Sequence, residues 1–175
     1  MLTVKIVFLI GPMGAGKTTI GRHLSDVLAL PFIDTDHEIE RRCGADIPWI
    51  FDVEGESGFR QREHRVLADT CAGGAAVVAT GGGIVMREDN RQLLQQQGAV
   101  VYLSATVAQQ LARTKKDRGR PLLNSADPKQ VLSDLMTLRD PLYREVADIT
   151  ITSGKMRPRS QANEIADKIR ALPQA

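Results

Sequence analysis

The sequence predicts an α/β protein: a three-layer αβα sandwich built on a five-stranded, mainly parallel β-sheet. Short runs rich in β-branched residues alternate along the chain with longer runs of helical periodicity, which is typical of repeated strand and helix units. Several of the strand runs are apolar at every position, as strands covered by helices on both faces are. A length of 175 residues suits a single domain that spans residues 1–175.

The elements alternate in the order that this class requires. We expect strands at residues 4–10, 31–34, 76–79, 100–103 and 149–151. We expect helices at residues 17–28, 47–53, 57–71, 88–97, 107–116, 128–146 and 159–172. The basic segment 115–125 interrupts this pattern with Gly119 and Pro121, and by itself it is compatible with a plain surface loop or with a mobile lid.

The composition excludes several classes of protein. The apolar run Ile6 to Ile10 is far shorter than the ~20 residues of a membrane span, and a glycine-rich loop follows it where a secretory signal would have its cleavage site. We therefore expect a cytoplasmic protein that binds no membrane. A net charge of +2 does not require a nucleic-acid partner. Cys43 and Cys71 lie far apart without CxxC spacing, which indicates neither a zinc site nor a disulfide.

A phosphate-binding motif directly follows the first predicted strand. Residues 11–19, Gly-Pro-Met-Gly-Ala-Gly-Lys-Thr-Thr, match GxxxxGK[ST] and lead into a predicted helix, as in a P-loop. Glycines let the backbone N–H groups approach phosphate oxygens, Lys17 can contact the β- and γ-phosphates, and the Thr18 hydroxyl can bind Mg²⁺. The residues that we expect to bind ATP here are Gly14, Ala15, Gly16, Lys17, Thr18 and Thr19.

The rest of the sequence favours a metabolite kinase over other P-loop proteins. Residues 52–55 match the DxxG string of a GTPase, but the chain has no Asn-Lys-x-Asp for guanine recognition. A motor ATPase would end a second apolar strand in an acidic pair, whereas residues 77–80 end in threonine and three glycines follow. Of the P-loop classes considered, this leaves a kinase that binds its acceptor in a pocket opposite the P-loop.

Two carboxylates close the second predicted strand. Strand alternation would point Asp34 and Asp36 to one side, at the carboxyl edge where open α/β sheets bind ligands. Mg²⁺ and an acceptor alcohol could then partner these like charges. The alternative interpretation is a turn and N-cap before a helix that starts near His37.

An ordered set of further segments resembles the shikimate kinase family. Beside the P-loop and Asp34-Thr35-Asp36, the set consists of Phe51 to Glu56, Gly58-Phe59-Arg60 with Glu63, Gly81-Gly82-Gly83, Arg120-Pro121-Leu122-Leu123 and Arg139-Asp140-Pro141-Leu142-Tyr143. The resemblance runs from about residue 5 to residue 160, and it implies the P-loop kinase fold with a mobile lid at about residues 113–125 and an acceptor-binding segment at about residues 35–63.

The resemblance also implies roles for individual residues. Arg60 and Arg139 would clamp the carboxylate of shikimate, and Asp36 would accept its reacting hydroxyl. The backbone of the triplet Gly81, Gly82 and Gly83 would touch the substrate where a side chain would obstruct it. Asp34 would lie near Mg²⁺, acting through water, so that Thr18 and Asp34 hold the metal.

On the nucleotide side, Arg120 would reach the ATP phosphates and Arg113 would stack on adenine, with residues 155–158 around the other face of the base. Our hypothesis for the chemistry is that Lys17, Mg²⁺ and Arg120 stabilise the transferring phosphoryl group while Asp36 orients the hydroxyl and takes its proton.

The implied reaction transfers the γ-phosphoryl group of ATP to the 3-hydroxyl of shikimate, giving shikimate 3-phosphate for aromatic amino-acid biosynthesis. The alternatives are another small kinase, acting on gluconate or a nucleotide, and a nucleotide-binding regulator without kinase activity. An aromatic content of 4% argues against a second base pocket. We expect a monomer, and the shikimate interpretation requires Arg60 and Arg139 to face a cleft beside Asp36.

Overall fold

The centre of the molecule is a parallel β-sheet. The structure, a computed structural model, describes residues 6–115, 117 and 119–173. Five strands follow the order β2-β3-β1-β4-β5, and each neighbouring pair is parallel. They are β1 (Ile6–Ile10), β2 (Phe32–Asp34), β3 (Ala76–Ala79), β4 (Gly98–Ser104) and β5 (Ile149–Thr152). The predicted α/β class with a five-stranded sheet is confirmed.

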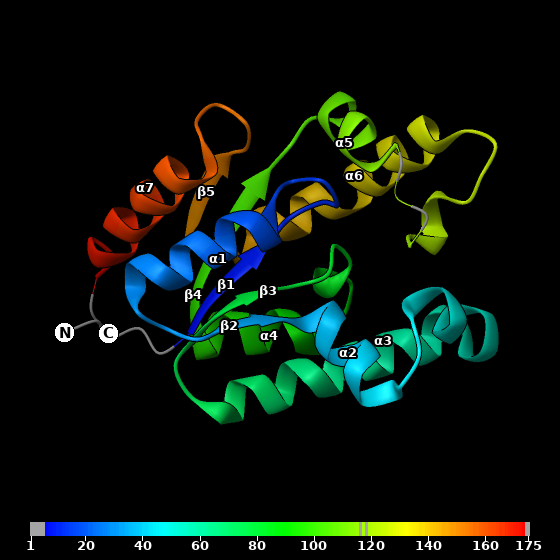
Figure 1. Ribbon diagram of the computed structural model, residues 1–175, viewed down its shortest axis with the longest axis horizontal. Coiled ribbons are helices and arrows are strands. Elements are labelled where there is room, and N and C mark those ends of the chain that lie inside the picture. Colours follow the sequence, from blue (N-terminus) through cyan, green and yellow to red (C-terminus); the bar gives the residue numbers. More distant parts are fainter. Residues whose placement is uncertain (1–5, 116, 118, 174–175) are drawn as a thin grey trace.

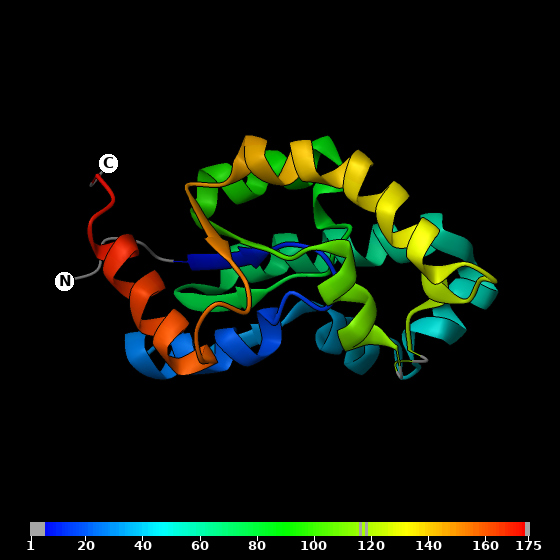
Figure 2. The same cartoon turned by 90° about the horizontal axis from the view of Figure 1, so that it is seen from above.

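Helices cover both faces of this sheet, which gives the three layers (Figure 1). The α-helices are α1 (Lys17–Leu28), α2 (Thr35–Cys43), α3 (Ile47–Gly73), α4 (Glu88–Gln97), α5 (Val107–Thr114), α6 (Pro128–Val146) and α7 (Pro158–Arg170). Two short 3₁₀ helices are η1 (Ile84–Met86) and η2 (Pro121–Leu123). Figure 2 shows α1 and α7 on one side of the sheet and α4 and α6 on the other.

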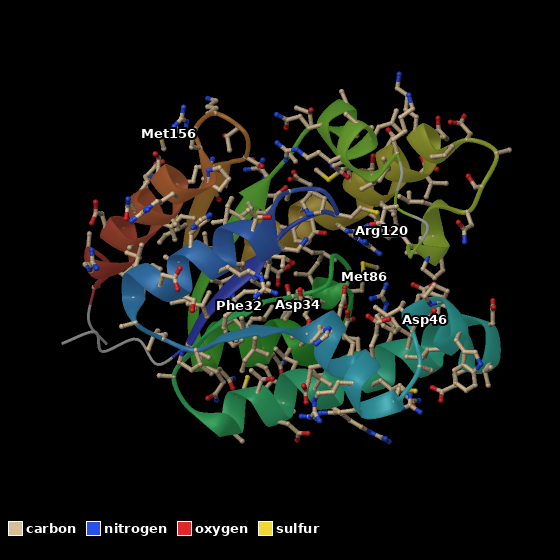
Figure 3. All side chains as sticks on the ribbon, viewed as in Figure 1. Phe32, Asp34, Asp46, Met86, Arg120 and Met156 are labelled. Carbon is tan, nitrogen blue, oxygen red and sulfur yellow. The ribbon has the colours of Figure 1, made fainter. Side chains whose placement is uncertain are left out.

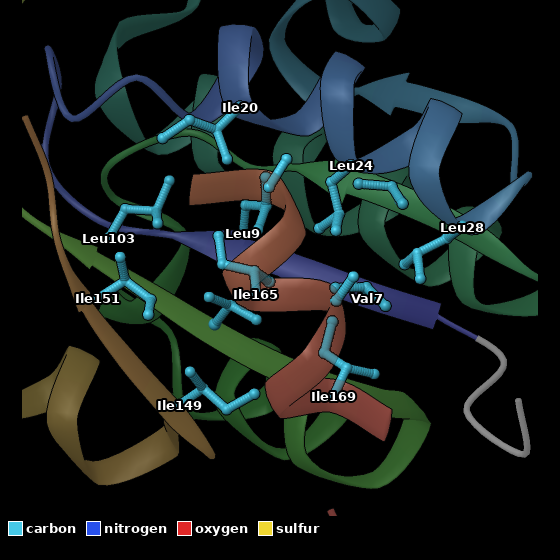
Figure 4. Close-up of a cluster of buried hydrophobic side chains, with 14 of the residues drawn as sticks. Val7, Leu9, Ile20, Leu24, Leu28, Leu103, Ile149, Ile151, Ile165 and Ile169 are labelled. Carbon is cyan, nitrogen blue, oxygen red and sulfur yellow. The ribbon is translucent and has the colours of Figure 1, made fainter. Parts of the chain in front are cut away.

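The alternation of side chains along β1 divides the core into two clusters. Val7 and Leu9 point to one face and pack with residues of α1 and α7, such as Leu24 and Ile165 (Figure 4). Ile6, Phe8 and Ile10 point to the other face and pack with residues of α3, α4 and α6, which are Leu67, Leu94, Tyr143 and Val146. Burial on both faces explains why this central strand is apolar throughout.

The sheet topology determines where a ligand can bind. Strand β1 lies in the middle, and the chain leaves it toward β3 and β2 on one side and toward β4 and β5 on the other. Ligands of open parallel sheets bind at such a switch point, beyond the carboxyl ends of the strands. The P-loop follows β1 there, α2 follows β2, and the glycine triplet 81–83 follows β3.

Several element boundaries differ from the sequence prediction. The list of predicted helices has none at α2, which starts directly after β2; the alternative interpretation, an N-cap before a helix near His37, is the one that the structure supports. The break predicted between the helices at residues 47–53 and 57–71 is confirmed, because non-helical backbone at Gly55, with φ of 71° and ψ of 179°, divides the element α3 there. Strand β4 starts two residues before its predicted start, and α7 ends two residues before its predicted end. Residues 4, 5 and 116 of the predicted elements lie outside the described residues.

Two smaller predictions can also be compared with the structure. In the part of the chain that the structure describes, no helix combines the length and the apolar character that crossing a bilayer requires. Cys43 and Cys71 are free thiols, each packed at the edge of a hydrophobic cluster.

Candidate active site

The P-loop turns tightly between β1 and α1. Gly11 has a φ of 143° and lies against the carbonyl of Leu103, where a Cβ atom would overlap it. Gly16 adopts the left-handed conformation, with φ of 89°, and caps α1 without any side-chain hydrogen bond. The first N–H groups of α1 therefore have no side-chain acceptor, and a phosphate at this helix start would meet N–H donors and the positive end of the helix dipole.

Lys17 is the positive side chain of this loop. Its Nζ donates hydrogen bonds to the carbonyls of Gly11, at 2.6 Å, and Pro12, at 2.9 Å. Burial, and after it the nearby charge of Arg120, lower the pKa of Lys17 to about 7, while Asp36 opposes the shift. A polyphosphate beside Nζ would favour the charged form of the lysine.

Asp34 is an N-cap, and the strand-alternation argument for Asp34 and Asp36 was wrong. Strand β2 ends at Asp34, whose Oδ1 accepts hydrogen bonds from the N–H groups of Asp36 (3.0 Å) and His37 (3.2 Å) at the start of α2. The capping geometry, which sequence reasoning treated as the rival interpretation, brings the two carboxylates together. The other oxygen, Oδ2, accepts a hydrogen bond from the Thr18 hydroxyl at 2.9 Å.

Asp36 lies in the pocket beyond this cap. Its Oδ1 is buried and has no hydrogen-bond partner among the described residues. Burial raises the pKa of Asp36 to about 7, with smaller contributions from the nearby carboxylates of Glu63 and Asp34. A buried carboxylate without a hydrogen-bond partner is stabilised when a donor such as an alcohol binds to it. With a pKa of about 7, it can also take up a proton near neutral pH.

The pocket beside Asp36 is assembled from separate segments. Arg60 comes from α3, Arg139 from α6, and Arg120 from the segment between α5 and α6. The glycine triplet contributes backbone, and Ile47, Phe51 and Phe59 contribute apolar surface. The structure thus brings Arg60 and Arg139 to the cleft beside Asp36, which is the arrangement that the shikimate interpretation requires.

Each glycine of the triplet lies against one or two polar side chains of this pocket. A Cβ on Gly81 would lie 2.7 Å from Glu63 Oε2 and 2.9 Å from Asp36 Oδ1. A Cβ on Gly83 would overlap the guanidinium group of Arg60, and one on Gly82 would lie 3.4 Å from Arg139 Nη1. A side chain at Gly81 or Gly83 would displace these polar groups, whereas a Cβ at Gly82 would only touch Arg139.

The buried Tyr143 of α6 holds the triplet in place, because its hydroxyl donates a hydrogen bond to the Gly82 carbonyl. Arg139 is 4% exposed, and burial lowers its pKa. The buried Arg139 and the partly buried Arg60 in one pocket favour an anionic ligand that can accept hydrogen bonds from both.

Glu63 is a pocket residue to which sequence reasoning assigned no role. It is fully buried, its Oε1 accepts a hydrogen bond from Arg60 Nη1 at 2.9 Å, and its Oε2 has no partner among the described residues. Burial raises the pKa of Glu63 despite the charge of Arg60. The sequence position of Glu63 could have indicated this role. Glu63 lies three residues after Arg60 and on the same helix face as Phe59 and Val66, which are both buried.

The segment predicted to be a lid carries two arginines with different surroundings. Arg120 lines the pocket, and its Nε donates a hydrogen bond to Asp117 Oδ2 at 2.6 Å. Figure 3 shows Arg120 together with Asp34, which lies at the end of β2. Arg113 is exposed and does not line this pocket; its Nη1 donates to the Gly14 carbonyl at 2.6 Å. Residues 116 and 118 of the lid lie outside the described residues.

The remaining predicted residues surround the P-loop. Ala15 is buried, Thr18 and Thr19 are exposed at the start of α1, and residues 155–157 are exposed before α7. The predicted residues therefore fall into two groups, those that line the pocket beside Asp36 and those around the P-loop, and Lys17 lies near both Asp36 and Arg120.

Comparison with known proteins identifies the family. A family model described as shikimate kinase matches residues 13–170. The chain belongs to the shikimate kinase family. The shikimate kinase of Pseudomonas paraeruginosa is 58% identical over 167 residues, which are 95% of this chain and 97% of that protein. The shikimate kinase of Alteromonas mediterranea is 54% identical over 93% of this chain and 95% of its own length.

Solved shikimate kinases share the fold. A shikimate kinase of Acinetobacter baumannii, solved in complex with shikimate, has a TM-score of 0.94 and 51% identity, and the match covers 97% of this chain and 95% of that one. The enzyme of Aquifex aeolicus has a TM-score of 0.81 and 33% identity, with 95% and 96% covered. A gluconokinase of Sinorhizobium meliloti, at 16% identity and a TM-score of 0.61, shares the fold alone.

Proposed function

We propose that this chain transfers the γ-phosphoryl group of ATP to the 3-hydroxyl group of shikimate, giving shikimate 3-phosphate in aromatic amino-acid biosynthesis. The observation that carries the proposal is the convergence of Arg60, Arg139 and Asp36 on one pocket next to Lys17 of the P-loop. The solved complex of the A. baumannii enzyme with shikimate supports the choice of acceptor. The gluconokinase likeness supports only the fold.

Shikimate offers a carboxylate and hydroxyl groups, and the pocket offers partners for both. Arg60 and Arg139 would bind the carboxylate through paired N–H donors, which are strong in a buried setting. Glu63 would hold Arg60 in place through the hydrogen bond that joins them. Phe51 and Phe59 supply apolar surface for the carbon ring of the acceptor.

In the proposed mechanism, the 3-hydroxyl oxygen attacks the γ-phosphorus, and the bond between that phosphorus and the oxygen that bridges to ADP breaks. Phosphoryl transfer depends on positioning and on neutralised charge more than on a strong base. Asp36 orients the hydroxyl and receives its proton late in the step, and a pKa of about 7 suits that role. Lys17 and Arg120 stabilise the charge that develops on the phosphoryl oxygens.

Thr18 and Asp34 fit a magnesium ion. Thr18 Oγ1, at the start of α1, and Asp34 Oδ2, at the end of β2, lie 2.9 Å apart. Mg²⁺ favours oxygen ligands and commonly uses one or two protein groups together with phosphates and water. Bound with ATP, Mg²⁺ would neutralise phosphate charge, and Asp34 would act on it through water. In the described residues, no three His, Cys, Asp or Glu side chains gather as a metal site.

The remaining parts of the proposal concern the lid and the state of the protein. The segment 113–125 would close over the reactants with Arg120 and exclude water, so that ATP is not hydrolysed. Arg113 would stack on adenine. We further propose that residues 1–175 form a single domain, which acts as a monomer in the cytoplasm with ATP and shikimate as its small-molecule partners.

An ADP-release assay with shikimate, with gluconate and with no acceptor tests the function. ADP should appear with shikimate, and nuclear magnetic resonance should place the phosphate on its 3-oxygen. Faster ADP release with gluconate would overturn the acceptor, and equal release without any acceptor would overturn kinase activity.

Arg139→Lys tests the carboxylate clamp. A lysine cannot replace a two-pronged guanidinium contact, so KM for shikimate should rise about 10- to 100-fold while KM for ATP stays within about twofold. Arg144→Lys is the matched control, because Arg144 lies on the same helix but is exposed and pairs with Asp140. A larger effect on KM for ATP than on KM for shikimate would contradict the clamp.

A further inference from the structure

Ser153, in the turn after β5, uses every polar group it has. The residue is 3% exposed. Its N–H donates to the Ser104 carbonyl at 2.8 Å, and its carbonyl accepts from the side chain of Gln109 at 3.4 Å. Its hydroxyl donates to the carbonyl of Ala15, in the P-loop, at 2.7 Å. This hydroxyl joins the phosphate loop to a turn that lies far away in sequence, the turn on which Figure 3 labels Met156.

The same hydroxyl accepts a hydrogen bond from Arg113. Nη1 of Arg113 donates to Ser153 Oγ at 2.9 Å and to the Gly14 carbonyl at 2.6 Å. A guanidinium group donates in its own plane, so these two bonds hold one edge and use neither flat face. Arg113 is exposed. An arginine held by its edge, with a face open to solvent, is suited to stack on a planar base.

Two glycines allow the three segments to meet at Arg113. Gly154 has a φ of 85°, and a Cβ there would lie 2.8 Å from Arg113 Nη2. Gly14 has a φ of 76°, and a Cβ there would lie 3.3 Å from Cβ of Arg113 and from Cα of Gln110. The phosphate loop, α5 and the turn after β5 are therefore packed closely around one guanidinium group, and Ser153, which belongs to that turn, hydrogen-bonds to the other two segments.

We propose that Ser153 is a positioning residue for the nucleotide: its hydroxyl holds the guanidinium group of Arg113 in the plane that stacks on the base of ATP. Ser153 acts through Arg113 and not by touching the nucleotide. The inference rests on the proposed function only as far as nucleotide binding, because it does not involve the acceptor pocket.

The test is Ser153→Ala, measured by calorimetry with Mg·ADP and by steady-state kinetics. The loss of one hydrogen bond to a charged partner should weaken ADP binding and raise KM for ATP by about 3- to 30-fold. The kcat value and KM for shikimate should stay within about twofold. Binding of magnesium tripolyphosphate, which has phosphates but no base, should not change. Ser153→Thr, which keeps the hydroxyl, should restore the ADP affinity.

Ser160→Ala is the matched control. It also removes one serine hydroxyl, but Ser160 is exposed at the start of α7. Ser153→Cys keeps the volume but donates and accepts weakly, so it gives the same readout if the alanine variant does not fold. Equal losses for ADP and tripolyphosphate would overturn the proposal, because Ser153 would then act on the phosphate loop alone.

A double-mutant cycle with Arg113→Ala decides whether Ser153 acts through Arg113. Ser153→Ala should cause no further loss of ADP affinity in the Arg113→Ala background, whereas additive losses would overturn the inference. The two proposals fail separately. An unchanged ADP affinity in Ser153→Ala, with normal shikimate phosphorylation by the wild type, overturns only the role of Ser153. A wild type that binds ADP but does not phosphorylate shikimate overturns only the proposed function.

Discussion

The proposed phosphate side and the proposed acceptor side of the site are built in different ways. On the phosphate side, the consecutive residues 11–19 supply backbone N–H groups and one lysine at the start of α1. On the acceptor side, Asp36, Arg60 and Arg139 come from three helices, and a glycine triplet comes from a turn after β3. A site built from consecutive backbone is visible as a motif, whereas a site built from distant side chains depends on how the helices pack.

The largest expected effect is on the phosphate side. Lys17→Met removes the positive charge that, in the proposed mechanism, meets the transferring phosphoryl group, so kcat should fall by on the order of 10²- to 10³-fold. The coupled ADP-release assay measures this. Lys168→Met, on the exposed surface of α7, is the control and should keep full activity. A loss of less than about tenfold in the Lys17 variant would show that the backbone amides alone stabilise the phosphates.

A smaller effect, confined to the acceptor side, is expected from Gly83→Ala. The new Cβ would displace the guanidinium group of Arg60, so KM for shikimate should rise about tenfold while KM for ATP stays unchanged. Gly73→Ala is the matched control, because a Cβ there meets no atom within 4 Å. Similar changes in both KM values would mean that the two sides of the site are not independent.

The smallest effect concerns stability. The pKa of Asp36 is about 7 in the folded protein and 3.8 in its ordinary state, so the folded protein holds the proton over a range where the unfolded chain releases it. Stability due to this group is therefore lost as pH rises from about 4 to about 7. Asparagine does not ionise, so Asp36→Asn prevents this loss of stability at high pH. At pH 8 the variant should be more stable than the wild type by about 1–2 kcal/mol, or roughly 3–8 °C in Tm.

At pH 5 the gain from Asp36→Asn should be clearly smaller. Thermal melts in EDTA, without nucleotide or shikimate, measure the difference between the two pH values. The control is Asp26→Asn on the exposed surface of α1, whose effect should be the same at both. A gain from Asp36→Asn that does not depend on pH would contradict the raised pKa.

The predicted elements show what local patterns can determine. The bounds of α1, β3 and α6 were predicted as the structure has them, because each has strong periodicity or a clear apolar run between breakers. Helix α2 was missed, because Asp34-Thr35-Asp36 was interpreted as strand and its nine residues carry only two buried side chains, Thr35 and Ile39. Residue-level propensity is weak in so short a helix, which is stabilised by the Asp34 cap.

The sequence by itself determined the fold class, the phosphate loop and the family. Each of these can be recognised from short contiguous stretches of sequence, whose residues determine the local backbone geometry. Only the tertiary structure decided that Glu63 is buried against Arg60, that Arg139 faces Asp36, and that Ser153 reaches both the P-loop and Arg113. The physical reason is that burial and hydrogen-bond partners depend on which helix faces pack together across the sheet. A single sequence does not contain that information at any one position.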